Sequence, residues 1–214
     1  MASFLNALLV IVLLLNFLAL GTSRIRTLIN TAAAQGVLLG IMPLFVHAEG
    51  FRFQSLAIAI ATIGLKGVVI PQMLLKALRD AQIKREVEPM IGTLPTMLLG
   101  ALGAAASMAL MAWLPASSRQ SDLLIIPASF TTILAGFLLL TTRVKAITQV
   151  TGYLLLENGI FIFGLLLLNA MPFLVEAGVL LDLFVGIFVI SIIINHMNRE
   201  FASLDTRRLT SLKD

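Results

Sequence analysis

Apolar residues occur in seven long runs that are separated by short polar connections. A helix needs about 20 mostly apolar residues to cross the hydrocarbon core of a bilayer. Each run has roughly that length, so the pattern predicts seven transmembrane helices. They cover Ser3–Gly21, Leu28–Val46, Ser55–Leu78, Leu94–Leu114, Leu123–Thr142, Ile147–Ala170 and Pro172–Asn195.

The first two runs are the least typical of the seven. Asn30 and Gln35 make the second run less apolar than the others. The first run could be a cleaved signal peptide, but no basic segment precedes its apolar stretch, which is also long for a signal sequence. We therefore expect both runs to be retained as membrane helices.

Composition supports an all-α, polytopic membrane protein. Hydrophobic residues make up 59% of the 214 residues and charged residues 12%, whereas soluble domains are about 45–50% apolar and about 25% charged. A chain this apolar cannot cover itself with a solvated surface, which excludes a soluble domain, a disordered chain and a nucleic-acid-binding protein. Because the chain has no cysteine, it offers no thiolate for an iron–sulfur cluster, a zinc site or catalysis.

Basic residues divide unevenly between the two sides of a seven-helix arrangement. Most of the 15 Lys and Arg fall on the side of the C-terminal tail: Arg24, Arg26, Lys76, Arg79, Lys84, Arg85, Arg143, Lys145, Arg199, Arg207, Arg208 and Lys213. The other side holds only Arg52 and Arg119, and Lys66 lies within a run. Cytoplasmic loops are enriched in Lys and Arg, so we expect the N-terminus outside and the C-terminus in the cytoplasm.

Four ionisable residues lie where a membrane helix is normally apolar. Lys66 is near the middle of the third run and Glu157 near the middle of the sixth, while the seventh contains Glu176 and, deeper, Asp182. A Lys or Asp at the centre of a span costs about 2.5–3.5 kcal/mol to insert. Such residues usually face the bundle interior or a hydrated cavity, pair with one another and mark ion pathways.

Glu157 is the strongest candidate for an ion-relay residue. Asn158 and Gly159 follow it, and they place an amide and a gap in the side-chain surface beside its carboxyl group. Burial favours a neutral carboxyl group and a nearby cation favours a carboxylate, so a group under both influences can exchange protons. The alternative is a static buried salt bridge to Lys66 that only fixes the packing.

Lys66 lies between Gly64 and Gly67, with Pro71 a little over one turn later. Pro71 has no N–H to donate to the carbonyl of Gly67, so we expect a kink that leaves room for water beside the ammonium group. A buried Lys can release its proton and carry or gate protons. The alternative is that Lys66 extends toward the membrane interface.

The seventh run holds the remaining candidates. Asp182 and Glu176 are about 240° apart around a helix, so they cannot both face one partner. Asp182 is deeper and is the better relay candidate, whereas Glu176 either lines the outer exit or sits at the interface. His196, at the inner end, could pass protons to the cytoplasm or could simply be solvated near the negative end of the helix dipole.

Small residues at helical spacing predict where helices approach closely. Gly36 and Gly40 form one such seam in the second run, and Gly152 and Gly159 form another in the sixth. The chain has no GxSxG, Walker A or HExxH motif, and its two His residues are far apart. We therefore expect no catalytic centre, bound cofactor or metal site in this chain.

Several segments resemble one family of membrane proteins. GYLLLENG around Glu157, LVEAGVLLDLFVGIFV around Asp182, the tail LDTRRLTSLKD and the spacing from Lys66 to Pro71 are similar to component E of hydrogenase-4 (HyfE-type). That component is a membrane subunit of group 4 NiFe hydrogenase and formate hydrogenlyase complexes. The resemblance covers nearly all seven runs. The last three runs also resemble the NuoK subunit of complex I and the C subunit of Mrp-type antiporters.

The resemblance implies a division of the chain and a role for its carboxylates. Residues 1–122 would form a four-helix region, 123–196 a NuoK-like three-helix region and 197–214 a cytoplasmic tail. In the relatives, one carboxylate in each of two adjacent helices belongs to a chain of ionisable groups along the membrane arm. Glu157 matches the first by its GxxxxE pattern. Asp182 lies nearest the second, with Glu176 as the competitor, so the sequence departs from its relatives there.

The resemblance also implies a setting for the chain. It would be a subunit of a hetero-oligomeric complex in a bacterial or archaeal inner membrane, next to antiporter-like subunits. The NiFe site and iron–sulfur clusters would lie on soluble hydrogenase subunits, and this chain would contribute to proton or sodium translocation coupled to their electron transfer. The alternatives are a purely structural subunit of the membrane arm and a component of an Mrp-type cation/proton antiporter.

Overall fold

A computed structural model of the chain describes residues 2–46, 53–80, 90–113, 124–167 and 178, and the regular structure in these segments is helical. The elements are α1 (Ala2–Gly21), α2 (Ile25–Val46), α3 (Phe53–Thr62), the π-helix η1 (Ile63–Val69), α4 (Ile70–Asp80), α5 (Thr93–Trp113), α6 (Ile125–Thr142) and α7 (Ala146–Leu167). Because α3, η1 and α4 follow one another without a break, they make one long helical segment.

Among the described residues, six helical stretches are long and apolar enough to cross a membrane. They are Ser3–Gly21, Ile25–Phe45, Ala59–Arg79, Thr93–Trp113, Ile125–Thr142 and Ala146–Leu165. These stretches correspond to the first six predicted runs, with ends that differ by a few residues. Over the described residues the regular structure is therefore all-α, as expected for a polytopic membrane protein. The predicted seventh helix, Pro172–Asn195, lies outside the described residues.

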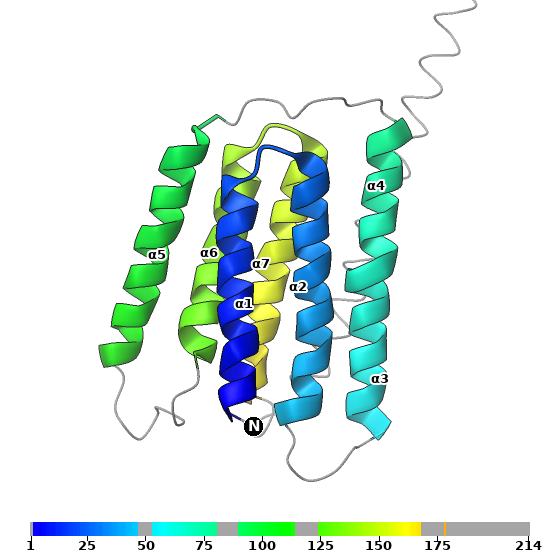
Figure 1. The fold of residues 1–214 in the computed structure, drawn as a ribbon, viewed down its shortest axis with the longest axis vertical. Coiled ribbons are helices and arrows are strands. Elements are labelled where there is room, and N and C mark those ends of the chain that lie inside the picture. Colours follow the sequence, from blue (N-terminus) through cyan, green and yellow to red (C-terminus); the bar gives the residue numbers. More distant parts are fainter. Residues whose placement is uncertain (1, 47–52, 81–89, 114–123, 168–177, 179–214) are drawn as a thin grey trace, which may run out of the picture.

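The helices stand side by side in a bundle (Figure 1). Helices α1, α2, α6 and α7 form its centre, α5 lies beside α6 and α1, and α3–η1–α4 lies beside α2. The α1–α2 and α6–α7 connections are at the same end of the bundle (Figure 1). The backbone N–H of Met90 donates to the carbonyl of Thr142 at 3.0 Å, which places the chain just before α5 at this end too.

This end of the bundle carries basic residues from three parts of the chain. Arg24 lies between α1 and α2, Arg79 in the last turn of α4, and Arg143 and Lys145 between α6 and α7. The fold thus brings together residues that the charge pattern assigned to one side of the membrane. That this side is cytoplasmic stays a prediction.

Apolar side chains from the two predicted regions, 1–122 and 123–196, pack together in shared clusters. Leu9 of α1 and Leu39 of α2 are buried with Ala128 of α6 and Ile162 of α7. A second cluster joins α2, α4 and α7, and a third joins α1, α2, α6 and α7. Helices from residues 1–122 and from 123–196 therefore pack directly against each other.

Two close approaches between helices depend on glycine. A Cβ atom at Gly159 of α7 would lie 2.6 Å from the backbone nitrogen of Ile133 in α6. A Cβ atom at Gly36 of α2 would lie 2.8 Å from the Cβ of Lys66 in η1. Both separations are shorter than a carbon atom tolerates, so any larger residue would push the helices apart. Gly36 and Gly159 are both in the predicted packing seams.

The π-helix η1 changes the winding of the third span around Lys66. The N–H of Ile70 donates to the carbonyl of Leu65, five residues earlier instead of the four of an α-helix. Pro71 follows and has no N–H for the ordinary bond to Gly67. The sequence predicted a kink caused by Pro71, and the structure shows a change of helical winding immediately before it.

Replacing Gly159 with alanine is expected to destabilise the bundle, because the new methyl group would press on the backbone of α6. Forcing a methyl group into a well-packed interior typically costs about 1–3 kcal/mol, which should lower the Tm of the detergent-solubilised protein by several degrees. Gly164→Ala on the same helix is the matched control, since no described residue lies within 4 Å of a Cβ there. Equal Tm values for the two variants would contradict the close packing of α6 and α7.

Candidate functional site

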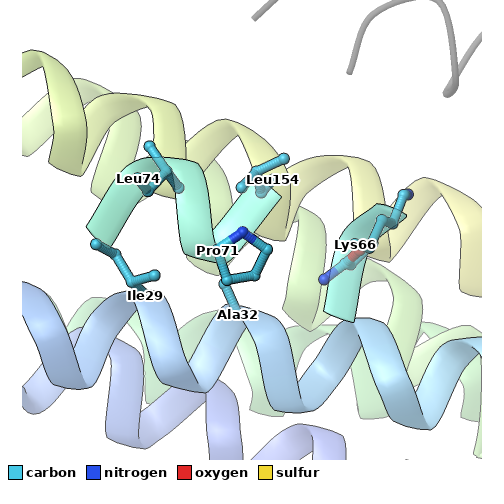
Figure 2. A pocket seen from close by; sticks show the side chains of 7 residues that line it. Ile29, Ala32, Lys66, Pro71, Leu74 and Leu154 are labelled. Carbon is cyan, nitrogen blue, oxygen red and sulfur yellow. The ribbon is translucent and has the colours of Figure 1, made fainter. Parts of the chain in front are cut away.

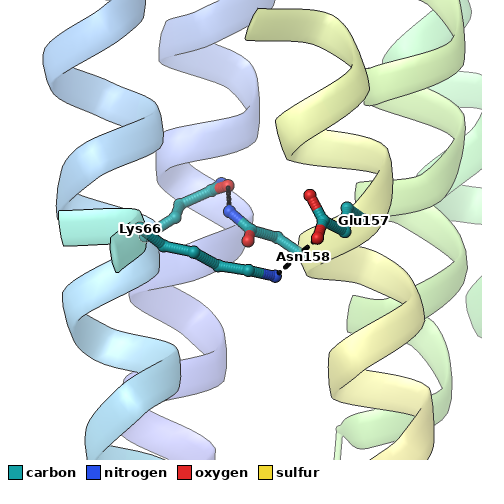
Figure 3. A network of polar contacts seen from close by, with 4 residues as sticks. Lys66, Glu157 and Asn158 are labelled. Carbon is teal, nitrogen blue, oxygen red and sulfur yellow. Dashed lines mark hydrogen bonds and ion pairs between the residues drawn. The ribbon is translucent and has the colours of Figure 1, made fainter. Parts of the chain in front are cut away.

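A lysine and a glutamate meet inside the bundle. The Nζ atom of Lys66 lies 3.4 Å from Oε1 of Glu157, and the two residues are only 8% and 4% exposed. Figure 3 shows their side chains reaching toward each other from η1 and α7. Removing a charge from water costs several kcal/mol, and an opposite charge in contact offsets part of that cost. Each residue therefore supplies the partner that makes the burial of the other tolerable.

The local sequence explains how the pair comes together. Gly36 lets α2 lie directly against η1 at Lys66, and Gly159 holds α7 close to α6. The ammonium group also lies 5.6 Å from the centre of the Phe161 ring. Phe161 is four residues after Glu157 and so lies on the same face of α7. A cation near the face of an aromatic ring is attracted to it, so α7 offers the lysine two favourable contacts.

A row of amide and hydroxyl groups lies next to the ion pair. Asn158 Nδ2 donates to Gln35 Oε1 at 3.5 Å, and Gln35 Nε2 donates to Asn16 Oδ1 at 2.8 Å. Asn16 Nδ2 then donates to Thr132 Oγ1 at 2.8 Å, and that hydroxyl donates to the carbonyl of Ala128 at 2.6 Å. These contacts, which we call the amide row, connect α7, α2, α1 and α6 in turn.

A small cavity opens beside Lys66 (Figure 2). Its lining is mostly apolar, with Lys66 and Asn158 as the polar members; the lining residues are Ile29, Ala32, Lys66, Pro71, Leu74, Leu154 and Asn158. The cavity has a volume of about 10 Å³, counted as the space that the centre of a water molecule can occupy. This volume is close to the minimum that one water needs. The sequence predicted room for water next to Lys66, and the cavity is at that position.

The structure brings together most of the candidate residues that it describes. Glu157, Lys66 and Asn158 converge, Pro71 lines the cavity, and Gly159 packs on α6; Gly67 faces Val37 of α2. Asp182, Glu176 and His196 lie outside the described residues. In the parts of the chain that are described, no group of three or more His, Asp or Glu side chains is arranged to hold a metal ion.

Sequence reasoning did not identify several residues of the interior. Gln35 was noted only as a polar interruption of the second run, and Asn16 and Thr132 were not singled out. Single amides within apolar runs were the available signal, because a buried amide must find a partner. Arg143, which the charge pattern placed in a loop, is 2% exposed and donates from Nη2 to the carbonyl of Leu20 at 3.3 Å.

Comparison with known proteins finds a relative of similar extent. The chain is similar to Rv0085, an uncharacterized protein of Mycobacterium tuberculosis, with 29% identity over 193 residues. The similarity covers 89% of this chain and 87% of that protein. No family model matches the chain, and no solved structure matches it.

Proposed function

We propose that this chain is a membrane subunit of a hydrogenase-like complex related to formate hydrogenlyase and complex I. In it, Lys66 and Glu157 belong to a proton or sodium path that is coupled to electron transfer on other subunits. The observation that carries the proposal is the buried ion pair beside a cavity of water size. Ionisable residues inside membrane helices usually face the bundle interior and mark ion pathways, and this pair has that location.

The pair has the physical properties of a switchable site. Both side chains are held in an interior of low polarity, where a change in nearby charge acts strongly because little water screens it. Moving one elementary charge through 100 mV corresponds to about 2.3 kcal/mol, and one pKa unit corresponds to about 1.36 kcal/mol. Under this proposal, electron transfer in a neighbouring subunit supplies an electrostatic change of that size to the pair.

The proposal extends to parts of the complex that this chain does not contain. The NiFe site and the iron–sulfur clusters are assigned to soluble partner subunits, and antiporter-like subunits are the neighbours within a bacterial inner membrane. A seventh helix would add Asp182 to the path, with Glu176 as the competing carboxylate or at the outer exit, and would place His196 at the cytoplasmic end. The resemblance of these segments to hydrogenase-4 component E supports the assignment.

A structural role is the second candidate, and the amide row favours it. Together with the ion pair, this row joins α1, α2, η1, α6 and α7 through buried polar contacts. Such contacts can specify which membrane helices are neighbours. In this view the pair fixes the shape of a subunit that links others, and its charges never change.

Glu157→Gln tests the transport role directly. The variant removes the ability of residue 157 to carry a proton, but the amide oxygen of glutamine can still accept a hydrogen bond from the Lys66 ammonium group, so the complex should assemble and still evolve hydrogen. Coupling should be lost, which means that substrate-driven proton or sodium movement in inverted membrane vesicles falls to background. Unchanged coupling in an assembled complex would refute the role of Glu157 in the path.

Lys66→Met is expected to destabilise the protein strongly, because it leaves the Glu157 carboxyl group buried without its cation. Breaking a buried pair typically costs about 3–5 kcal/mol, and chemical denaturation of the protein in detergent would measure the loss. Lys76→Met, at an exposed position of the same span, should change stability little. Similar losses for both variants would contradict a stabilising pair.

The double variant Lys66→Met/Glu157→Met separates the two candidate functions. Replacing both members of a buried pair with apolar residues is often neutral or stabilising, so stability and assembly should recover relative to Lys66→Met alone. Under the transport proposal, coupling stays lost in this restored protein. Recovery of coupling together with assembly would support the structural role instead.

A further inference from the structure

An acceptor without a partner lies beside the cavity that Lys66 lines. Asn158 is 2% exposed, and its Oδ1 atom has no hydrogen-bond partner among the residues that the structure describes. Figure 3 shows this oxygen on the side of the Lys66 side chain, and both residues line the cavity. Buried polar groups that lack a protein partner are normally satisfied by ordered water.

The direction of the Asn158 amide is determined by the amide row behind it. At the far end, the carbonyl of Ala128 can only accept, so the Thr132 hydroxyl donates to it and its oxygen accepts from Asn16. Asn16 must then present its oxygen to Gln35, and Gln35 must present its oxygen to Asn158. Rotating any one amide by half a turn would set two donors or two acceptors against each other. Asn158 therefore donates to Gln35 and keeps its carbonyl oxygen for another donor.

We propose that the cavity binds one water molecule between Asn158 and Lys66, and that Gln35 positions its acceptor. The water donates a hydrogen bond to Asn158 Oδ1 and accepts one from the Lys66 ammonium group. A buried water needs two to four polar partners, and these two residues supply two. The side chains of the other lining residues, including Ile29 and Pro71, are apolar.

The water would be a further hydrogen-bond partner for Lys66, and this consequence rests on the proposed function. An ammonium group has three N–H donors, so it can serve a carboxylate and a water together. When Glu157 takes up a proton, its attraction for the ammonium group weakens, while the water contact remains. Lys66 can then stay buried through both states of the pair. Gln35 acts in this scheme only through Asn158, as a positioning residue.

Solid-state NMR of the full chain in lipid bilayers tests the water site. With asparagine labelled by 15N, magnetisation that starts on water should reach the side-chain amide of Asn158, whose signal is identified by its loss in Asn158→Leu. Asn16 is the internal control, because it is 1% exposed and both ends of its amide are bonded within the amide row. A transfer to Asn158 as slow as that to Asn16 would overturn the proposal.

The positioning role of Gln35 has its own matched variants. Gln35→Leu removes the acceptor for Asn158, so the transfer from water to the Asn158 amide should be lost or change several-fold. Thr31→Val is the control on the same helix, since its hydroxyl donates to the carbonyl of Thr27 in the preceding turn. An unchanged transfer in Gln35→Leu would overturn the positioning role.

Two smaller substitutions test the same role of Gln35 if Gln35→Leu does not fold. Thr132→Val removes the acceptor at the far end of the amide row, and Thr131→Val alters the adjacent residue, which contacts Ser107 instead. Only Thr132→Val should change the Asn158 signal, and equal effects would again overturn the positioning role. None of these measurements depends on transport. A failure of the coupling experiment with Glu157→Gln would therefore remove the proposed function and leave the water site standing.

Discussion

A lysine ammonium group facing a glutamate carboxyl group inside an apolar bundle is the interaction on which the other features depend. Lipid tails are as apolar as leucine, so the burial of apolar side chains does little to determine which membrane helices become neighbours. The contact between Lys66 and Glu157 selects η1 as a neighbour of α7. Because Gly36 has no side chain, α2 can approach η1 closely at Lys66. Gln35 extends the same polar interior toward α1.

The site takes residues from both of the predicted regions, 1–122 and 123–196. Lys66 and Gln35 come from the first region, whereas Glu157, Asn158 and Thr132 come from the second. Neither region alone contains both members of the ion pair or a complete amide row. Shared apolar clusters join the same helices, so the polar contacts and the apolar packing stabilise one arrangement. A change in the packing between the two regions would therefore alter the distance between Lys66 and Glu157 directly.

The helices and the ion pair differ in how far the sequence determines them. Six spans could be predicted because a bilayer requires a fixed length of apolar chain, whatever the order of its residues. Lys66 and Glu157 were recognisable because ionisable residues are rare in such runs. The direction of the Asn158 amide could not be predicted, since it depends on which helices are neighbours. Gln35 was visible as an interruption of its run, but only the fold shows that it meets Asn16.

The π-helix makes the third span a place where chain length can change during evolution. Each backbone hydrogen bond in a π-helix joins residues five apart instead of four apart. The segment therefore contains more residues than an α-helix of the same length would. Deletion of one residue between Ile63 and Val69 could be absorbed by a return to α-helical winding, with little movement of α3 or α4 along the bundle. Because π-helical and α-helical winding place successive side chains at different angles around the axis, the deletion would, however, turn Lys66 away from its present direction. A homologue with a shorter third span is then expected to have lost the charge opposite its glutamate.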